Sequence, residues 1–77
     1  METRNYRILL HLEPEGGYTV TVPTLPGCVT YGEDIPQAIH MAREAIELYI
    51  ESLVAHGEPV PDEHGTLEYN VLVPVHA

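Results

Sequence analysis

Apolar and polar residues alternate over three stretches near the start of the chain, a pattern typical of half-buried β-strands. The stretches cover residues 4–12, 18–22 and 28–31. The inward face of the first would carry Tyr6, Ile8, Leu10 and Leu12. Residues 13–17 read Glu-Pro-Glu-Gly-Gly, in which proline presets φ and either glycine accepts a positive φ. We therefore expect the first two strands to form an antiparallel hairpin.

Residues 23–27, Pro-Thr-Leu-Pro-Gly, separate the second and third strands. Pro23 has no N–H to donate, so strand pairing should end there. Pro26 and Gly27 complete a rigid corner with Leu25 at its centre, which we expect to be exposed. Two interpretations stay open: a connection with only a structural role, which we favour, or a preorganised corner that presents Leu25 to a partner.

A helical repeat begins after Asp34, which is a good N-cap. Gln37 three residues later fits a capping box, and Pro36 falls in the first turn, where its missing N–H is tolerated. Apolar residues follow at helical spacing: Ile35, Ala38, Ile39, Ala42, Ala45, Ile46, Tyr49, Ile50 and Leu53. With Gly57 as the stop signal, the pattern predicts a helix from about residue 35 to about residue 56.

After a linker rich in proline and glycine at residues 58–66, apolar residues alternate again over residues 67–75 and predict a last strand. The order β-β-β-α-β predicts an α+β fold with one helix packed on one face of a small mixed sheet. A right-handed crossover would place the last strand parallel to the first. One helix cannot cover both faces, so Leu9 and Leu72 are candidates for an open or oligomer-forming face.

The chain has 77 residues, and 44% of them are apolar, which fits one small globular domain. So small a domain is only marginally stable alone. Cys28 is the only cysteine in the sequence, so no internal disulfide can form. Oligomerisation is the remaining common way to stabilise such a core, and we expect a homo-oligomer, most simply a dimer.

The charge is strongly unbalanced, with twelve acidic residues against three arginines and a net charge of −9. Nucleic-acid binding requires clustered basic residues, so we expect no binding to nucleic acid. The charge would attract a basic partner at long range, although by itself it is explained equally well by solubility. The polar start and the absence of a long apolar run predict a cytoplasmic protein without a membrane segment.

Several short motifs follow one another along the chain: Glu15-Gly16-Gly17-Tyr18, Val22 through Cys28, Gly32-Glu33-Asp34, Gln37-Ala38, Ala42 through Ile46, and Gly57 through Pro61. In this order they resemble the HicB-like antitoxin family. The resemblance covers about Tyr6 to Val75, and the ordered set at these spacings is specific. Its structural positions in this sequence are Gly17, Pro23, Pro26, Gly27, Cys28, Gly32 and Asp34.

The resemblance implies a truncated ribonuclease H-like fold and a protein that binds and blocks a HicA toxin, a small basic protein that cleaves mRNA. Many family members also carry a C-terminal DNA-binding domain. This sequence stops at Ala77, directly after the predicted last strand. We therefore expect a single domain over residues 1–77 without the DNA-binding part, which leaves open whether the antitoxin role is retained.

Catalytic chemistry finds little support in the sequence. A metal-dependent nuclease needs several carboxylates that converge on metal ions, whereas the acids here lie in predicted turns or on the helix. No histidine lies at a sequence position that indicates activation of the Cys28 thiol, so we interpret Cys28 as a small buried hydrophobic residue. The histidines show no metal-site spacing; they are His11, His40, His56, His64 and His76. We therefore expect no enzyme activity, no metal site and no cofactor.

Glu44, Glu47 and Glu51 lie along the outward face of the predicted helix at i, i+3 and i+7. Most such faces are only solvated. The resemblance makes these three the first candidates for contacts that steer a basic toxin. The alternative is a stand-alone oligomeric regulatory or scaffold module without a toxin, and a nuclease ranks last. A toxin-sized basic reading frame beside the gene would separate the first two interpretations.

Overall fold

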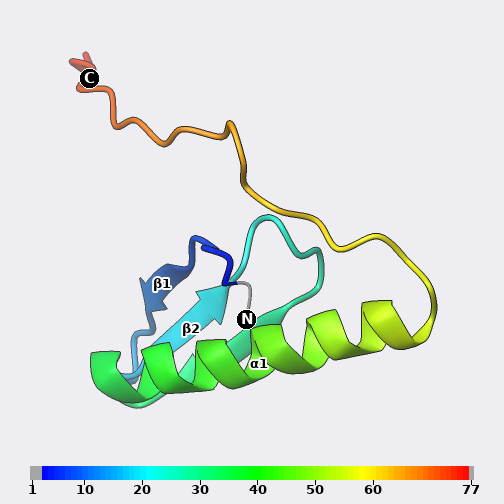
Figure 1. The fold of residues 1–77 in the computed structure, drawn as a ribbon. Coiled ribbons are helices and arrows are strands. Elements are labelled where there is room, and N and C mark those ends of the chain that lie inside the picture. The colour runs from blue at the N-terminus through cyan, green and yellow to red at the C-terminus, as the bar shows by residue number, and fades with distance from the viewer. Residues whose placement is uncertain (1–2, 77) are drawn as a thin grey trace.

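Three strands and a long helix form where the alternating and helical patterns predict them, and the α+β class is confirmed. A computed structural model describes residues 3–76. The strands are β1 (Leu9–Leu12), β2 (Tyr18–Thr21) and β3 (Val29–Gly32), and they precede helix α1 (Ile35–Ala55). Figure 1 shows α1 lying across one face of the small sheet. The likeness to ribonuclease H stays a prediction.

The sheet is antiparallel throughout, with the order β1-β2-β3. Leu10 pairs with Val20 in the first ladder, and Val20 pairs with Thr30 in the second. Glu13 closes the β1–β2 hairpin, because its N–H donates to the carbonyl of Gly17 at 2.9 Å. The predicted hairpin is therefore confirmed. Its first strand is shorter than expected, since residues 4–8 precede β1 without belonging to the sheet.

Both ends of α1 are capped by the expected residues. The Asp34 carboxylate accepts from the N–H of Gln37 at 2.8 Å, while the Gln37 side chain accepts from the N–H of Glu33 at 2.6 Å. At the other end, Gly57 has a φ of +69°. The N–H groups of Gly57 and Glu58 donate to the carbonyls of Val54 and Leu53, which forms a Schellman motif.

The core consists of two small groups of buried residues. Val20 is packed with Ala38 and Ala42, and the half-buried Ile8, Leu10 and Tyr18 surround this group. The second group contains Val22, Leu25 and Cys28, against which Tyr6, Ile8, Ala45, Ile46 and Tyr49 pack. The inward orientation predicted for Tyr6, Ile8 and Leu10 is thereby confirmed. The same prediction for Leu12 is wrong, because its side chain is 61% exposed.

The exposure predicted for Leu25 is wrong, because this side chain is fully buried. The corner closes on itself: the N–H of Leu25 donates to Val22 at 3.0 Å, and the N–H of Cys28 donates to Leu25 at 3.0 Å. The Tyr49 hydroxyl donates to the carbonyl of Pro26 at 2.7 Å and ties the corner to α1. The Pro-Thr-Leu-Pro-Gly pattern specifies a corner, but it does not tell which way the central side chain points.

Gly32 lets the helix approach the end of β3 closely. A Cβ atom added at Gly32 would lie 2.4 Å from the backbone of Ala38 and 2.8 Å from its Cβ atom. These distances are far inside van der Waals contact. Any side chain at residue 32 would therefore push the first turns of α1 away from the sheet.

The last strand predicted for residues 67–75 is absent, and with it the mixed sheet. Residues 66–76 have no regular secondary structure and are exposed. Figure 1 shows them running away from both the sheet and the helix. Alternating apolar residues indicate that a segment suits a strand, but a strand also needs an edge to pair with. Within one chain, no described strand provides that edge to this segment.

The burial of Leu25 predicts a large difference between two leucine-to-alanine substitutions. Leu25→Ala should lower the free energy of unfolding by about 2–5 kcal/mol, because it leaves a cavity in the second core group. Leu48→Ala should change it little, because the Leu48 side chain is 66% exposed on α1. Urea denaturation followed by circular dichroism measures both. Equal stability of the two variants would contradict the buried position of Leu25.

Candidate partner-binding surface

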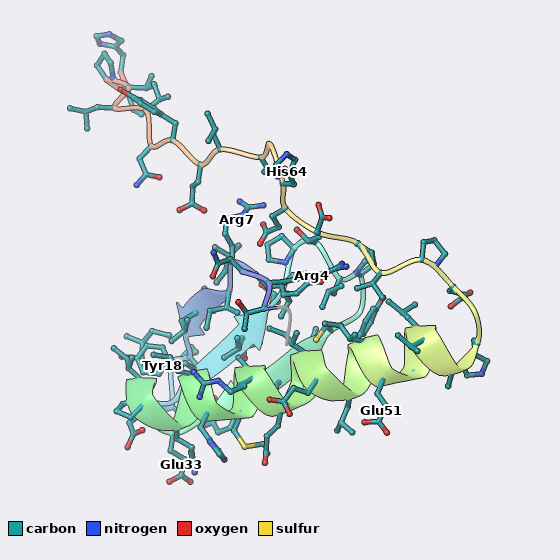
Figure 2. All side chains as sticks on the ribbon, in the orientation of Figure 1. Arg4, Arg7, Tyr18, Glu33, Glu51 and His64 are labelled. Carbon is teal, nitrogen blue, oxygen red and sulfur yellow. The ribbon has the colours of Figure 1, made fainter. Side chains whose placement is uncertain are left out.

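The outward face of α1 carries the three acidic residues predicted to steer a partner. Glu44, Glu47 and Glu51 are all exposed. Figure 2 shows Glu51 pointing from α1 to the side away from the sheet. The His40 Nε2 atom lies 3.6 Å from Glu44 Oε1, and both side chains are mostly exposed. The helical spacing thus places three carboxylates on solvent-facing turns of one rigid element.

An apolar hollow of about 870 Å³ lies beside this acidic face, between α1 and the residues that precede β1. Its helical wall carries Ile39, Ile46, Ile50 and Val54. Ile8 contributes from the opposite side, and Val60 contributes from the linker. Of the three candidate glutamates, Glu47 alone lines the hollow, together with Arg43. Part of the apolar stripe of α1 therefore extends beyond the sheet and faces the hollow instead.

Residues 4–7 hold the linker close to the body of the domain. Arg4 Nη1 donates to the carbonyl of Val60 at 3.2 Å, and the Tyr6 hydroxyl donates to the carbonyl of Pro61 at 2.6 Å. Arg7 Nε donates to Glu63 Oε1 at 2.5 Å, and the Arg7 backbone N–H donates to the other oxygen of the same carboxylate. Figure 2 shows Arg4 and Arg7 beside the linker. We call this set of contacts the linker clamp.

The Arg7–Glu63 ion pair shifts the pKa values of both partners. Burial alone would raise the pKa of Glu63, whose side chain is only 10% exposed. The hydrogen bonds from Arg7 and Thr24, together with the charge of Arg7, outweigh this effect and hold the pKa of Glu63 below its usual value. The hydrogen bonds to Glu63 and Glu68 in turn raise the pKa of Arg7. The linker is therefore fixed by a carboxylate that stays charged to a lower pH than an ordinary glutamate does.

The two leucines proposed for an open face lie on separate parts of the structure. Leu9 is exposed on β1, and Leu72 is almost completely exposed in the segment that leaves the domain. The single chain does not unite them in one sheet, because residue 72 is not part of a strand. Their role in oligomer formation stays a prediction.

The motif residues occupy positions that shape the fold. A Cβ atom at Gly17 would lie 1.9 Å from the Tyr31 hydroxyl, so a side chain there would collide with the Tyr31 ring. Cys28 is buried, and burial raises the pKa of its thiol. Among residues 3–76, no three His, Cys, Asp or Glu side chains are grouped as metal ligands would be. No helix in the same range is long and apolar enough to cross a membrane.

The sequence interpretation missed both the linker clamp and the hollow. Arg7 falls within the predicted first strand over residues 4–12, and Glu63 falls within the predicted linker over residues 58–66. A signal for the hollow was present in α1, since Ile39, Ile46 and Ile50 widen the apolar stripe beyond the two buried alanines. No local pattern marks the clamp, because its partners are 55 or 56 residues apart.

The linker clamp predicts a pH-dependent stability difference between the natural chain and Glu63→Gln. Folding lowers the pKa of Glu63, so its contribution to stability is complete above the unfolded value of about 4.3 and is lost as the pH falls through the folded value. At pH 7 the variant should unfold at lower urea concentration. The gap should start to narrow below about pH 4, near the unfolded value, and should close as the pH falls through the folded value. A constant gap from pH 7 to pH 3 would show that the charge on Glu63 does not stabilise the fold.

The part of the chain that carries the sequence motifs is similar to known proteins. Residues 6–74 match the family described as HicB-like antitoxin of bacterial toxin–antitoxin system. The UPF0150 protein ssr1765 of Synechocystis is 51% identical over 59 residues, which cover 77% of this chain and 75% of the relative. The UPF0150 protein Ta0767 of Thermoplasma acidophilum is 41% identical over 59 residues, which cover 77% and 86%. The chain therefore belongs to the HicB-like antitoxin family.

Proposed function

We propose that this protein is an antitoxin-type binding protein that occludes a small, basic, mRNA-cleaving toxin of the HicA type. Family membership supports a toxin partner of some kind. The observation that carries the more specific proposal is the exposed acidic face of α1 in a chain with a net charge of −9. In this proposal the chain contributes no chemistry, and inhibition is steric and electrostatic.

A toxin that binds RNA must present positive charge at its RNA site. Glu44, Glu47 and Glu51 offer carboxylates on a rigid helix, and they can compete with phosphate groups for that charge. The electric field of these carboxylates accelerates the diffusional encounter of the two proteins. Added salt should slow association, because exposed charges are screened beyond about 8 Å at physiological ionic strength.

An exposed leucine supplies the apolar contact that a stable complex needs. Leu48 lies four residues after Glu44 and three before Glu51, so all three lie close together on α1. Its side chain is 66% exposed and free to enter a pocket of the toxin. Apolar contacts depend less on salt than charge contacts do, so dissociation of the complex should vary little with salt.

The alternative is an oligomeric regulatory or scaffold module that has no toxin partner. The exposed apolar segment at residues 66–76 favours this alternative, since it offers a surface for self-association. The two functions differ in their requirements. The first needs the acidic face of α1, and the second does not.

Charge removal on the acidic face provides the test. Replacing Glu44, Glu47 and Glu51 together by Gln removes three charges and keeps good helix formers. We expect a slower association rate and a weaker salt dependence, with a nearly unchanged dissociation rate. The partner in this experiment is a purified basic toxin of the HicA type, and stopped-flow mixing at several salt concentrations measures the rates.

A second triple variant controls for net charge. Glu15, Glu33 and Glu58 are exposed and lie outside α1, so replacing them by Gln removes the same charge from other places. This variant should lose less of the association rate than the α1 variant. Equal effects of the two variants would mean that only overall charge matters and that the acidic face is not the contact surface.

A further inference from the structure

We call the segment of residues 66–76 the C-terminal arm. Its apolar residues alternate as in a buried strand, but its side chains are exposed. Its apolar side chains on one face are 65–93% exposed; they are Leu67, Tyr69, Val71, Val73 and Val75. The Cα radius of gyration is 15.0 Å. A compact chain of this length would have about 11.5 Å. A continuous exposed apolar face of this kind marks an interaction surface.

The arm is directed away from its own sheet by a fixed turn. Gly65 has a φ of +80°, and the N–H of Thr66 donates to the carbonyl of Glu63 at 2.9 Å. This is the geometry of a turn that favours glycine at its third position. The linker clamp holds Glu63 itself against Arg7. The arm therefore starts from a base that the linker clamp holds in place, and beyond this turn it runs away from its own sheet (Figure 1).

β1 offers the edge that the arm lacks. It lies at one end of the sheet order β1-β2-β3, so its far side has no strand. Hydrogen-bonded and non-hydrogen-bonded pairs alternate in an antiparallel ladder. Because Glu13 bonds to Gly17, the register assigns the next bonded pairs to His11–Thr19 and Leu9–Thr21. The backbone groups of Leu10 and Leu12 therefore point to the open edge.

The apolar hollow lies on the helix side of the domain, beside the residues that lead into β1. Ile8 lines the hollow and shares the face of Leu10, which packs toward α1. A strand added at the edge of β1 would turn alternate residues to that face. Its apolar residues would then cover Ile39, Ile46 and Ile50, which the three-stranded sheet leaves open. One added strand would thus pair with the free backbone groups of β1 and also cover the apolar lining of the hollow.

We propose that two copies of this chain form a dimer by exchanging C-terminal arms, each arm adding a fourth strand to β1 of the other copy. Arm and edge are both present on every chain, so the two contacts are equivalent and the assembly closes with two-fold symmetry. A basic toxin fits this site less well than a second copy does, because residues 67–75 contain one charged side chain, Glu68. The inference does not depend on the proposed toxin.

The proposal is tested by complementation between two full-length variants. Leu12→Pro removes an N–H from the open edge of β1, and Leu12 is largely exposed, so little packing is lost. Val71→Asp puts a charge on the apolar face of the arm. Each variant alone should dimerise at least about tenfold more weakly than the natural chain. Their mixture should form heterodimers, since the intact arm of one variant meets the intact edge of the other.

Two matched variants control for side-chain loss and for charge. Leu12→Ala removes the same side chain as Leu12→Pro but keeps the N–H, and it should still dimerise. Asn70→Asp adds the same charge as Val71→Asp on the opposite face of the arm, and it should weaken the dimer less. Native mass spectrometry of the separate and mixed variants, which differ in mass, gives the populations.

Amide hydrogen exchange gives a second measurement that does not rely on the proline variant. In the natural chain, the N–H groups of Leu10 and Leu12 should exchange more slowly as the protein concentration rises. In Val71→Asp they should exchange fast at all concentrations tested. A natural chain that is monomeric throughout the micromolar range, protection that is independent of concentration, or a mixture without heterodimers would each overturn the proposal.

Discussion

The close contact between Gly32 and Ala38 sets the arrangement of the whole domain. Because residue 32 has no side chain, the first turns of α1 rest directly on the end of β3. Ala38 and Ala42 then bring the helix down onto Val20, the most central residue of the sheet. The helix packs on β3 and β2 and makes few contacts with β1. The apolar hollow lies where this offset leaves the helix uncovered, beside the residues that precede β1.

The parts of the fold that depend on neighbouring residues could be predicted from the sequence. The cap at Asp34, the stop at Gly57 and the hairpin at residues 13–17 all follow from local geometry, and the structure contains all three. The C-terminal arm could not be predicted in this way. Its alternation suits a strand, but beyond the turn at Gly65 these residues lie outside the sheet and have no strand to pair with in the single chain.

The candidate surface shows the same division. Helical spacing was enough to place Glu44, Glu47 and Glu51 on solvent-exposed turns. Burial of Leu25 was not predictable, because a proline-rich corner can turn its central residue inward or outward. The Arg7–Glu63 pair joins residues 56 positions apart, and no periodicity reports such a distance. The exposed position of charged residues on a helix can therefore be predicted from sequence, whereas contacts between the two ends of the chain cannot.

Cys28 gives this small domain a built-in reporter of its own opening. The thiol is buried beside Leu25 and Val22, and burial keeps its pKa raised, so the reactive thiolate is scarce in the folded state. Because the sequence contains no second cysteine, any alkylation signal comes from this one position. The rate at which a small alkylating reagent modifies the native protein therefore follows how often the corner of residues 23–27 detaches from α1. No label has to be introduced for that measurement.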